Sequence, residues 1–99
     1  MPEFSTPYSV KKSDRKLTKE ELIRAIRFSI ASEYEAIQLY EEIEECIDNA
    51  DAKKLLHEIA DDEKVHVGNF LHLLKLLSPE EEESYEEGCE EAQEILDGE

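Results

Sequence analysis

The sequence is poor in the residues that break helices and in those that cross-link small domains. Its 99 residues include 3 glycines, 3 prolines, 2 cysteines and no tryptophan. Cys46 and Cys89 form no CxxC pair, which excludes a zinc knuckle or an iron centre built on paired cysteines. No apolar run approaches the roughly 20 residues that span a bilayer, and residues 1–16 lack the apolar segment of a signal peptide. We therefore expect a soluble, cytoplasmic protein with reduced thiols.

Positive charge is scarce as well. Lysine and arginine number 11 against 27 aspartates and glutamates, which gives a formal net charge of -16. Such a chain repels phosphates, so nucleic acid and anionic membrane surfaces are excluded as partners, whereas cations are attracted. A chain of this length buries only a modest core, which favours association with further copies.

The composition that remains, 39% hydrophobic and 38% charged, is typical of long amphipathic helices. We expect a flexible segment over 1–16, an antiparallel helical hairpin over 17–77 and an acidic helix over 78–99. Thr18 followed by Glu21 is a capping box that begins the first helix. Residues 48–51 predict the turn of the hairpin, and Ser78, as N-cap before Pro79, begins the third helix. The fold class is therefore all-α.

Each predicted helix carries an apolar stripe at alternating spacings of three and four. On the first helix it consists of Leu22, Ile26, Ile30, Ile37, Tyr40 and Ile47. On the second it consists of Leu55, Ile59, Phe70, Leu73 and Leu77. On the third it consists of Tyr85, Cys89, Ala92 and Leu96. His57 and His72 lie off these stripes and are expected to be exposed, and Glu44 lies on the first stripe near the helix end.

Three polar residues interrupt the apolar stripes. Glu33 stands near the middle of the first stripe, and Glu63 and His66 stand at the middle of the second. A buried carboxylate without a partner costs several kcal/mol, so each glutamate calls for a cation or a hydrogen-bond donor. Glu63 and His66 are one helical turn apart on the same face, and the middles of two antiparallel helices lie at similar heights. We expect the three side chains to converge on a metal ion.

A purely structural interpretation is that an arginine or lysine neutralises Glu33 and that His66 is a hydrogen-bonded core residue. Against it, none of the lysines on the second helix shares the stripe: Lys53, Lys54, Lys64 and Lys75. Carboxylates with one imidazole form a hard, oxygen-rich ligand set, which favours iron or manganese over a structural zinc site. Calcium fits only if His66 is not a ligand.

At these residues the sequence resembles the ferritin-like di-iron carboxylate superfamily, and most closely the encapsulated ferritins. The resemblance covers residues 18–77 and rests on SEYEAIQLYEEI and IADDEKVHVGNF. In the superfamily pattern a glutamate precedes a tyrosine by seven places, here Glu33 and Tyr40, and Glu-x-x-His follows on the second helix. The superfamily fold is a four-helix bundle with twice the ligands that this chain supplies. Two hairpins related by a two-fold axis would complete it with four glutamates and two histidines.

The resemblance also implies an activity and an assembly. Encapsulated ferritins form rings of dimers, here expected to be a decamer with ring contacts through the third helix, inside encapsulin shells, and oxidise ferrous iron for storage there. It implies that Glu33 and His66 bind the irons terminally, that Glu63 bridges them, and that Tyr40 donates a hydrogen bond nearby. An acidic pair commonly lines the path of the incoming metal in this family, and only Glu35 matches it because Ser32 takes the other place. The shell-targeting peptide of free-standing members is missing as well, so the chain is either a domain of a shell fusion or not targeted.

Three other functions stay open at this stage. A rubrerythrin-like peroxidase would use the same ligands, although such proteins usually add a rubredoxin centre, which needs CxxC. A non-catalytic helical assembly module would use Glu33 and His66 as a buried polar pair that fixes register. An acidic mimic of nucleic acid is suggested by charge alone and ranks last.

Overall fold

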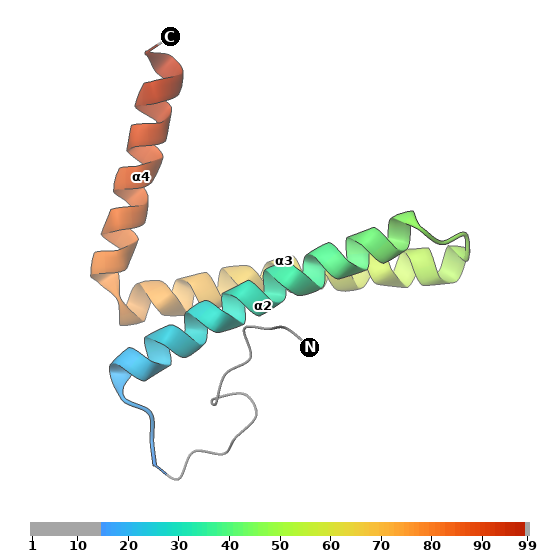
Figure 1. The fold of residues 1–99 in the computed structure, drawn as a ribbon, viewed down its shortest axis with the longest axis horizontal. Helices are drawn as coiled ribbons and strands as arrows, with labels where there is room; N and C mark the ends of the chain where they lie inside the picture. Colours follow the sequence, from blue (N-terminus) through green and yellow to red (C-terminus); the bar gives the residue numbers. More distant parts are fainter. Residues whose placement is uncertain (1–14, 99) are drawn as a thin grey trace.

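The computed structural model describes residues 15–98, so residues 1–14 of the predicted flexible segment lie outside the described part of the chain. Within residues 15–98 there are three helices and no strand, which confirms the predicted all-α class: α2 (Lys19–Glu45), α3 (Ala50–Leu77) and α4 (Pro79–Asp97). Figure 1 shows α2 and α3 side by side as an antiparallel hairpin, with α4 leaving its far end at a steep angle. No helix in this part of the chain is long and apolar enough to cross a membrane.

The first helix begins at the predicted capping box. The Glu21 amide donates to the Thr18 hydroxyl at 3.1 Å, and the Thr18 amide donates to the Glu21 carboxylate at 2.9 Å. Both guanidinium NH2 groups of Arg15 donate to the same carboxylate at 2.7 Å. Together the Arg15 guanidinium and the Thr18 amide lower the pKa of Glu21 from 4.5 to about 2. The carboxylate therefore stays ionised and holds the start of α2.

The turn between α2 and α3 is short, and side chains form hydrogen bonds with its backbone groups. The Asn49 amide oxygen accepts from the Ala52 amide at 2.9 Å, which caps the start of α3. The Lys53 ammonium group donates to the carbonyl oxygens of Glu44 at 2.9 Å and Ile47 at 3.4 Å. This lysine thus contacts one carbonyl in the last turn of α2 and one in the connection that follows it.

The hairpin core is a narrow seam. On α2 it contains Ile26, Ile30 and Ile37, as the first stripe predicts. On α3 the predicted stripe is confirmed only in part: the buried residues recur every seven positions and are Ala60, Val67 and Leu74, none of which the stripe includes.

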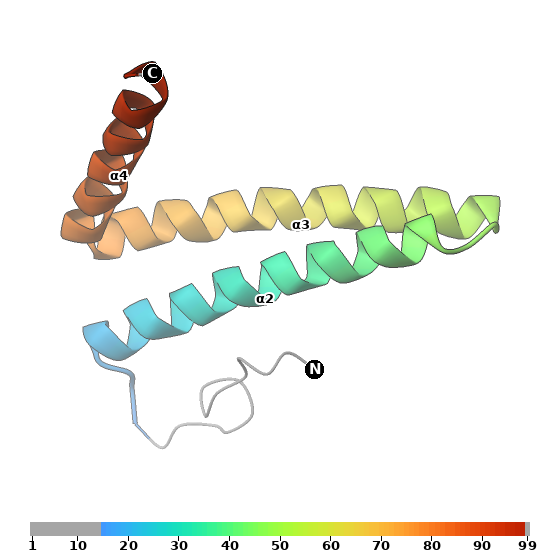
Figure 2. The ribbon, with the colours of Figure 1, turned by 45° about the horizontal axis from the view of Figure 1, so that its top comes forward.

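Stripe residues of α3 lie beside this seam, with Phe70 and Leu77 partly buried and Leu55 63% exposed. Two helices can cover only a narrow line of each other's surface, whereas the stripe is wide enough to meet a further partner. The uncovered part of α3 continues the face that carries Glu63 and His66. In Figure 2 the two helices spread apart toward the end that carries α4.

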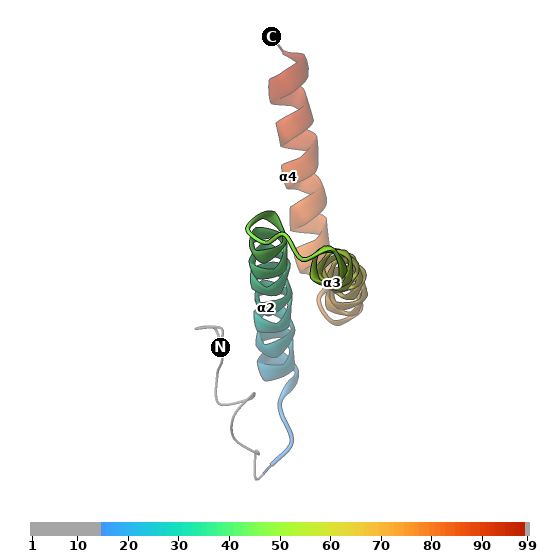
Figure 3. The ribbon, with the colours of Figure 1, turned by 90° about the vertical axis from the view of Figure 1, so that its right-hand side faces the viewer.

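The last helix is held to the hairpin at its first turn. The Arg27 guanidinium donates to both carboxylate oxygens of Glu81 at 3.1 and 2.5 Å, and the Tyr85 hydroxyl donates to Glu81 as well. Pro79 occupies the first turn and Ser78 is the N-cap residue, as predicted. The Ser78 side chain makes no capping hydrogen bond, whereas its backbone carbonyl accepts from the amides of Glu81 and Glu82. Beyond Glu82 every described residue of α4 is exposed. Figure 3, seen along the hairpin, shows α4 rising clear of it.

Candidate metal centre

Three predicted residues converge at the middle of the hairpin. The Nδ1 atom of His66 lies 3.1 Å from a carboxylate oxygen of Glu33 on α2 and 3.1 Å from one of Glu63 on α3. One potential ligand atom from each of the three residues lies within 4.8 Å of the others. Ile30 and Ile37 pack into the core on either side of Glu33, and this packing sets its height along α2. The helical turn between Glu63 and His66 brings the second carboxylate and the imidazole to the same level.

The two carboxylates are largely withdrawn from solvent, whereas the imidazole is not. The side chains of Glu33 and Glu63 are each 18% exposed, and that of His66 is 51% exposed. The pKa of Glu33 is raised, first because burial disfavours its charged form, and next because Glu63 shares a hydrogen bond with it and repels its charge. His66 acts in the opposite direction. A cation at this point would relieve the repulsion that a proton otherwise relieves.

The donor set fits iron. Two carboxylate oxygens and one imidazole nitrogen are the ligands that carboxylate-bound iron and manganese take, and neither cysteine belongs to the group. It is the one group of this kind in residues 15–98. A hollow of about 460 Å³ opens beside it, lined by Glu33, His66, Asn69 and Phe70. Three ligand atoms from one chain leave that side of an ion free for ligands from elsewhere.

The exposure of His66 argues against the purely structural interpretation, in which His66 is a hydrogen-bonded core residue. The imidazole stands at the edge of the seam, on a surface that one hairpin leaves open. Tyr40 is half-buried two turns beyond Glu33, and within the described chain no hydrogen bond joins it to the three residues. Glu35 is exposed, and two positions from Glu33 its side chain points to the other side of α2. The structure thus brings together three of the five predicted site residues.

Asn69 is a residue of the hollow that the sequence did not single out. It stands three positions after His66, on the next turn of α3, and lines the same hollow. Its spacing repeats the spacing of Glu63 and His66, which places it on the same face of α3. Spacing alone does not single it out in the sequence, because asparagine is common in helices rich in polar residues.

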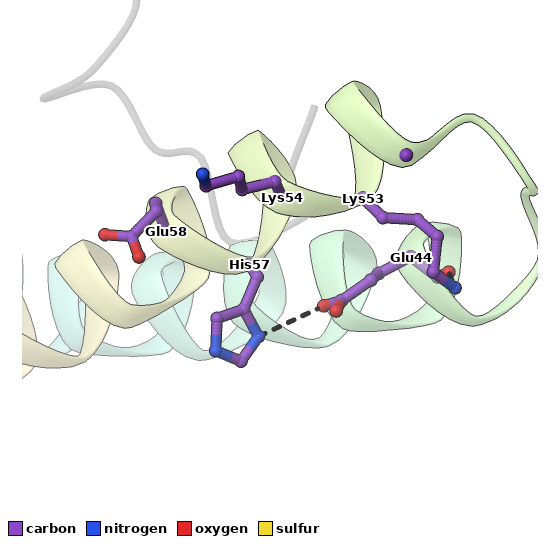
Figure 4. A pocket seen from close by; sticks show the side chains of 6 residues that line it. Glu44, Lys53, Lys54, His57 and Glu58 are labelled. Carbon is purple, nitrogen blue, oxygen red and sulfur yellow. Dashed lines mark hydrogen bonds and ion pairs between the residues drawn. The ribbon is translucent and has the colours of Figure 1, made fainter.

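A second polar cluster near the hairpin turn is less suited to a metal. His57 Nδ1 lies 3.5 Å from Glu44, as the dashed line in Figure 4 shows, and His57 Nε2 lies 3.5 Å from Asp61. The two carboxylates therefore face different ring nitrogens, and one ion cannot bind all three groups. Lys53 and Lys54 line the same hollow and repel cations. His57 and His72 are exposed, as predicted.

Known proteins are similar to this chain in sequence and in fold. The sequence model of the rubrerythrin family matches residues 24–97. The ferritin-like-encapsulin shell fusion protein of Pyrococcus furiosus is 39% identical over 82 residues, which is 83% of this chain and 24% of that protein. The encapsulin nanocompartment cargo protein EncC of Myxococcus xanthus is 38% identical over 84 residues, which is 85% of this chain and 65% of that protein. The chain thus spans about a quarter of the first and just under two thirds of the second.

A solved structure shares the fold. The crystal structure of the encapsulated ferritin domain from Pyrococcus furiosus superposes with a TM-score of 0.83 at 36% identity. The superposition covers 92% of this chain and 93% of that one. The hairpin and the steeply angled third helix are therefore a shared architecture, and the centre described above lies within the matched family region.

Proposed function

This chain belongs to the rubrerythrin family and is an encapsulated ferritin, and we propose that it acts as a ferroxidase. In this proposal it oxidises Fe(II) to Fe(III) at a di-iron site formed between two subunits. The observation that supports this most directly is the convergence of Glu33, Glu63 and His66 on an open face of the hairpin. Iron is the substrate of this reaction as well as the ion that the residues bind.

Pairing of two hairpins completes the site. On α3 the apolar residues Ile59 and Leu73 are exposed on the face that carries Glu63 and His66. A two-fold axis through this face would bury them and double the ligands to four glutamates and two histidines, the set that ferritin-like bundles use. The exposed side of His66 would then face the partner subunit instead of water.

The charges of the doubled site suit binding before oxidation and release after it. Four carboxylates carry four negative charges, which balance two ferrous ions and fall short of two ferric ions. In this proposal Glu33 and His66 bind terminally, Glu63 bridges, and the His66 nitrogen that faces the carboxylates gives up its proton to bind. Adjacent ferrous ions supply the electrons that reduce dioxygen or peroxide. Tyr40 is proposed to donate a hydrogen bond near the site, and Glu35 to line the path of incoming iron.

Storage requires a compartment that a hairpin dimer does not enclose. Two named relatives are an encapsulin shell fusion protein and an encapsulin cargo protein. We propose that this chain works inside an encapsulin nanocompartment in the cytoplasm, as a ring of dimers with ten subunits. Ferric iron formed at the dimer site would then be deposited in the shell interior.

Ferrous oxidation followed by the absorbance of the ferric product tests the activity. We expect Glu63→Ala to slow oxidation by at least about 100-fold. Losing a residue that only orients a metal ligand lowers activity by about 10- to 100-fold, and Glu63 is proposed to bind the iron itself. Glu58→Ala is the matched control, because Glu58 is an exposed glutamate of the same helix away from the centre. It should leave the rate unchanged. Equal rates for wild type and Glu63→Ala would refute the proposal.

Peroxide reduction is the second candidate, favoured by the match to the family described as rubrerythrin. The same ligands would serve it, but a peroxidase would keep its irons and draw further electrons from an external reductant, whereas a ferroxidase releases the ferric product. Supplying hydrogen peroxide and a reductant to the ferrous-loaded protein, and measuring bound iron before and after, distinguishes the two. Repeated peroxide reduction without loss of bound iron would assign the chain to peroxide reduction, and release of ferric iron in proportion to the ferrous iron oxidised would assign it to ferroxidase action.

A further inference from the structure

One nitrogen of the His66 imidazole has no partner in the described chain. The Nδ1 atom lies 3.1 Å from carboxylate oxygens of Glu33 and Glu63, whereas no hydrogen bond or ion pair joins the Nε2 atom to any residue in 15–98. The two nitrogens stand on different sides of the ring, so Nε2 is directed away from the two carboxylates. A neutral imidazole carries a proton on one nitrogen only. Binding a metal through Nδ1 therefore requires the proton on Nε2.

A proton held on Nε2 needs an acceptor. Histidines that bind metals almost always donate their second N–H to an oxygen, and this hydrogen bond fixes the tautomer and the orientation of the ring. Water can serve while the His66 side chain is 51% exposed. In the proposed pairing of hairpins the same side of His66 faces the partner subunit, where water has less access, and a buried donor without an acceptor is unfavourable. An oxygen of the protein would then have to take the place of water.

Asn69 is well placed to supply that oxygen. It lies on the next turn of α3 and lines the same hollow of about 460 Å³ as His66. Side chains of a helix lean toward its start, which directs the Asn69 amide back over the turn that carries His66. No hydrogen bond joins this amide to any described residue, so its oxygen is available. An amide oxygen also accepts a hydrogen bond without adding a charge beside two carboxylates.

A second acceptor near His66 is the carboxylate of Asp62, four positions before it on α3. This spacing also places two side chains next to each other on a helix. Within residues 15–98, however, no ion pair joins Asp62 to His66, and Asp62 does not line the hollow. The placement of the side chains therefore favours Asn69.

We propose that Asn69 is a positioning residue, whose amide oxygen accepts a hydrogen bond from Nε2–H of His66 and leaves Nδ1 free to bind the metal. This inference rests on the metal centre of the proposed function and makes no assumption about the oxidant. Asn69 acts only through His66 and does not bind the ion itself. Its loss should therefore change metal affinity and the state of the imidazole, and leave the fold intact.

Zinc binding by the full chain, measured by competition with a chelator at one protein concentration, tests the effect on affinity. Zn(II) has no redox chemistry, so the result does not depend on oxidation. Asn69→Leu has a similar shape without an acceptor and should weaken zinc binding by about 10- to 100-fold, the usual cost of losing such a partner. Asn69→Asp keeps an acceptor oxygen and should bind zinc at least as tightly as wild type. His72→Leu, at an exposed residue one turn further along α3 and outside the hollow, is the matched control and should bind as wild type does.

NMR of the zinc-loaded protein, labelled with 15N-histidine, tests the hydrogen bond itself. The chain has 3 histidines, so comparison with His72→Leu simplifies the assignment of His66. In wild type and Asn69→Asp the Nε2–H proton of His66 should exchange slowly with water, and in Asn69→Leu it should exchange faster. Urea unfolding of the metal-free protein should be the same for wild type and Asn69→Leu, because Asn69 is exposed.

Equal zinc affinities for Asn69→Leu and His72→Leu would overturn the proposal, as would Nε2–H exchange that does not respond to Asn69→Leu. Zinc binding that is weakened as much by Asn69→Asp as by Asn69→Leu would overturn it too, because the acceptor oxygen would then not matter. Zinc that leaves the His66 signals of wild type unchanged would refute the metal centre as a whole. A chain that meets every expectation for zinc but oxidises no ferrous iron would lose only the proposed activity.

Discussion

Replacing Glu33 with glutamine should make the metal-free protein more stable and the iron-loaded protein less so. Glu33 and Glu63 place two carboxylates within 4.8 Å of each other, each 18% exposed. Their repulsion amounts to about 3 kcal/mol at an effective dielectric constant of about 20, and about 1 kcal/mol when solvent screens it fully. Losing the charge also weakens the contact with His66, which offsets about 1 kcal/mol. A net gain of about 1 kcal/mol remains for Glu33→Gln without metal.

The pH dependence of this gain has a definite sign. Burial and the neighbouring carboxylate raise the pKa of Glu33 above 4.5. Stability that depends on its protonated form is therefore present below pH 4.5 and is lost as the pH rises through the raised pKa. Glutamine does not titrate, so the advantage of Glu33→Gln over wild type should be near zero at pH 4 and largest at neutral pH.

Urea unfolding followed by circular dichroism measures the effect, with a chelator present and at one protein concentration, because the proposed pairing of subunits would make stability depend on concentration. Glu35→Gln is the matched control, since Glu35 is an exposed glutamate on the same turn of α2. Adding ferrous iron without oxygen should reverse the order, because only wild type keeps both carboxylates. A metal-free Glu33→Gln protein that is less stable than wild type at neutral pH would refute this account of the site's electrostatics. So would an equal gain from Glu35→Gln.

Two further predictions concern the helices that hold the site. Wild type should lose stability on acidification between pH 4.5 and about 2, because the carboxylate of Glu21, paired with Arg15, stabilises α2 above pH 4.5 and is protonated across that range. Glu21→Gln should lose less stability over the same range. Acid titration followed by circular dichroism would show parallel curves for the two proteins if the carboxylate contributes nothing. Val67→Ala should lower the free energy of unfolding by about 2 kcal/mol, because Val67 is buried in the seam. Leu55→Ala should lower it by less than about 0.5 kcal/mol, because Leu55 is exposed. Similar losses at both positions in urea unfolding would contradict the position of the core.

Local signals in the sequence correctly predicted the ends of the helices and the buried residues of α2. Thr18 with Glu21 and Asn49 before α3 act through neighbouring backbone groups, so short segments contain all the information they need. The convergence of Glu33 with Glu63 and His66 was predictable because a short turn sets the relative height of two helices. In each case the structure follows from residues close in sequence or from a simple antiparallel geometry.

Features that depend on tertiary packing were not predictable. The stripe of α3 is wider than the seam that α2 covers, and the sequence does not say which edge of a stripe a neighbouring helix takes, so Ala60 and Val67 were missed. The pairing of Arg27 with Glu81 spans 54 positions, and nothing in the surroundings of either residue marks it. Both depend on how whole helices lie, which a periodic pattern leaves undetermined.

The open side of His66 has a consequence for how the reaction depends on protein concentration. In the proposed function one hairpin supplies three ligand residues, and the surface that would complete the site is the surface on which two hairpins would pair, so oxidation would require association. Oxidation should therefore be second order in protein when the chain is dilute and first order once pairing is saturated. Freshly synthesised single chains would then be inert toward ferrous iron, and ferric product would form only where subunits are already gathered.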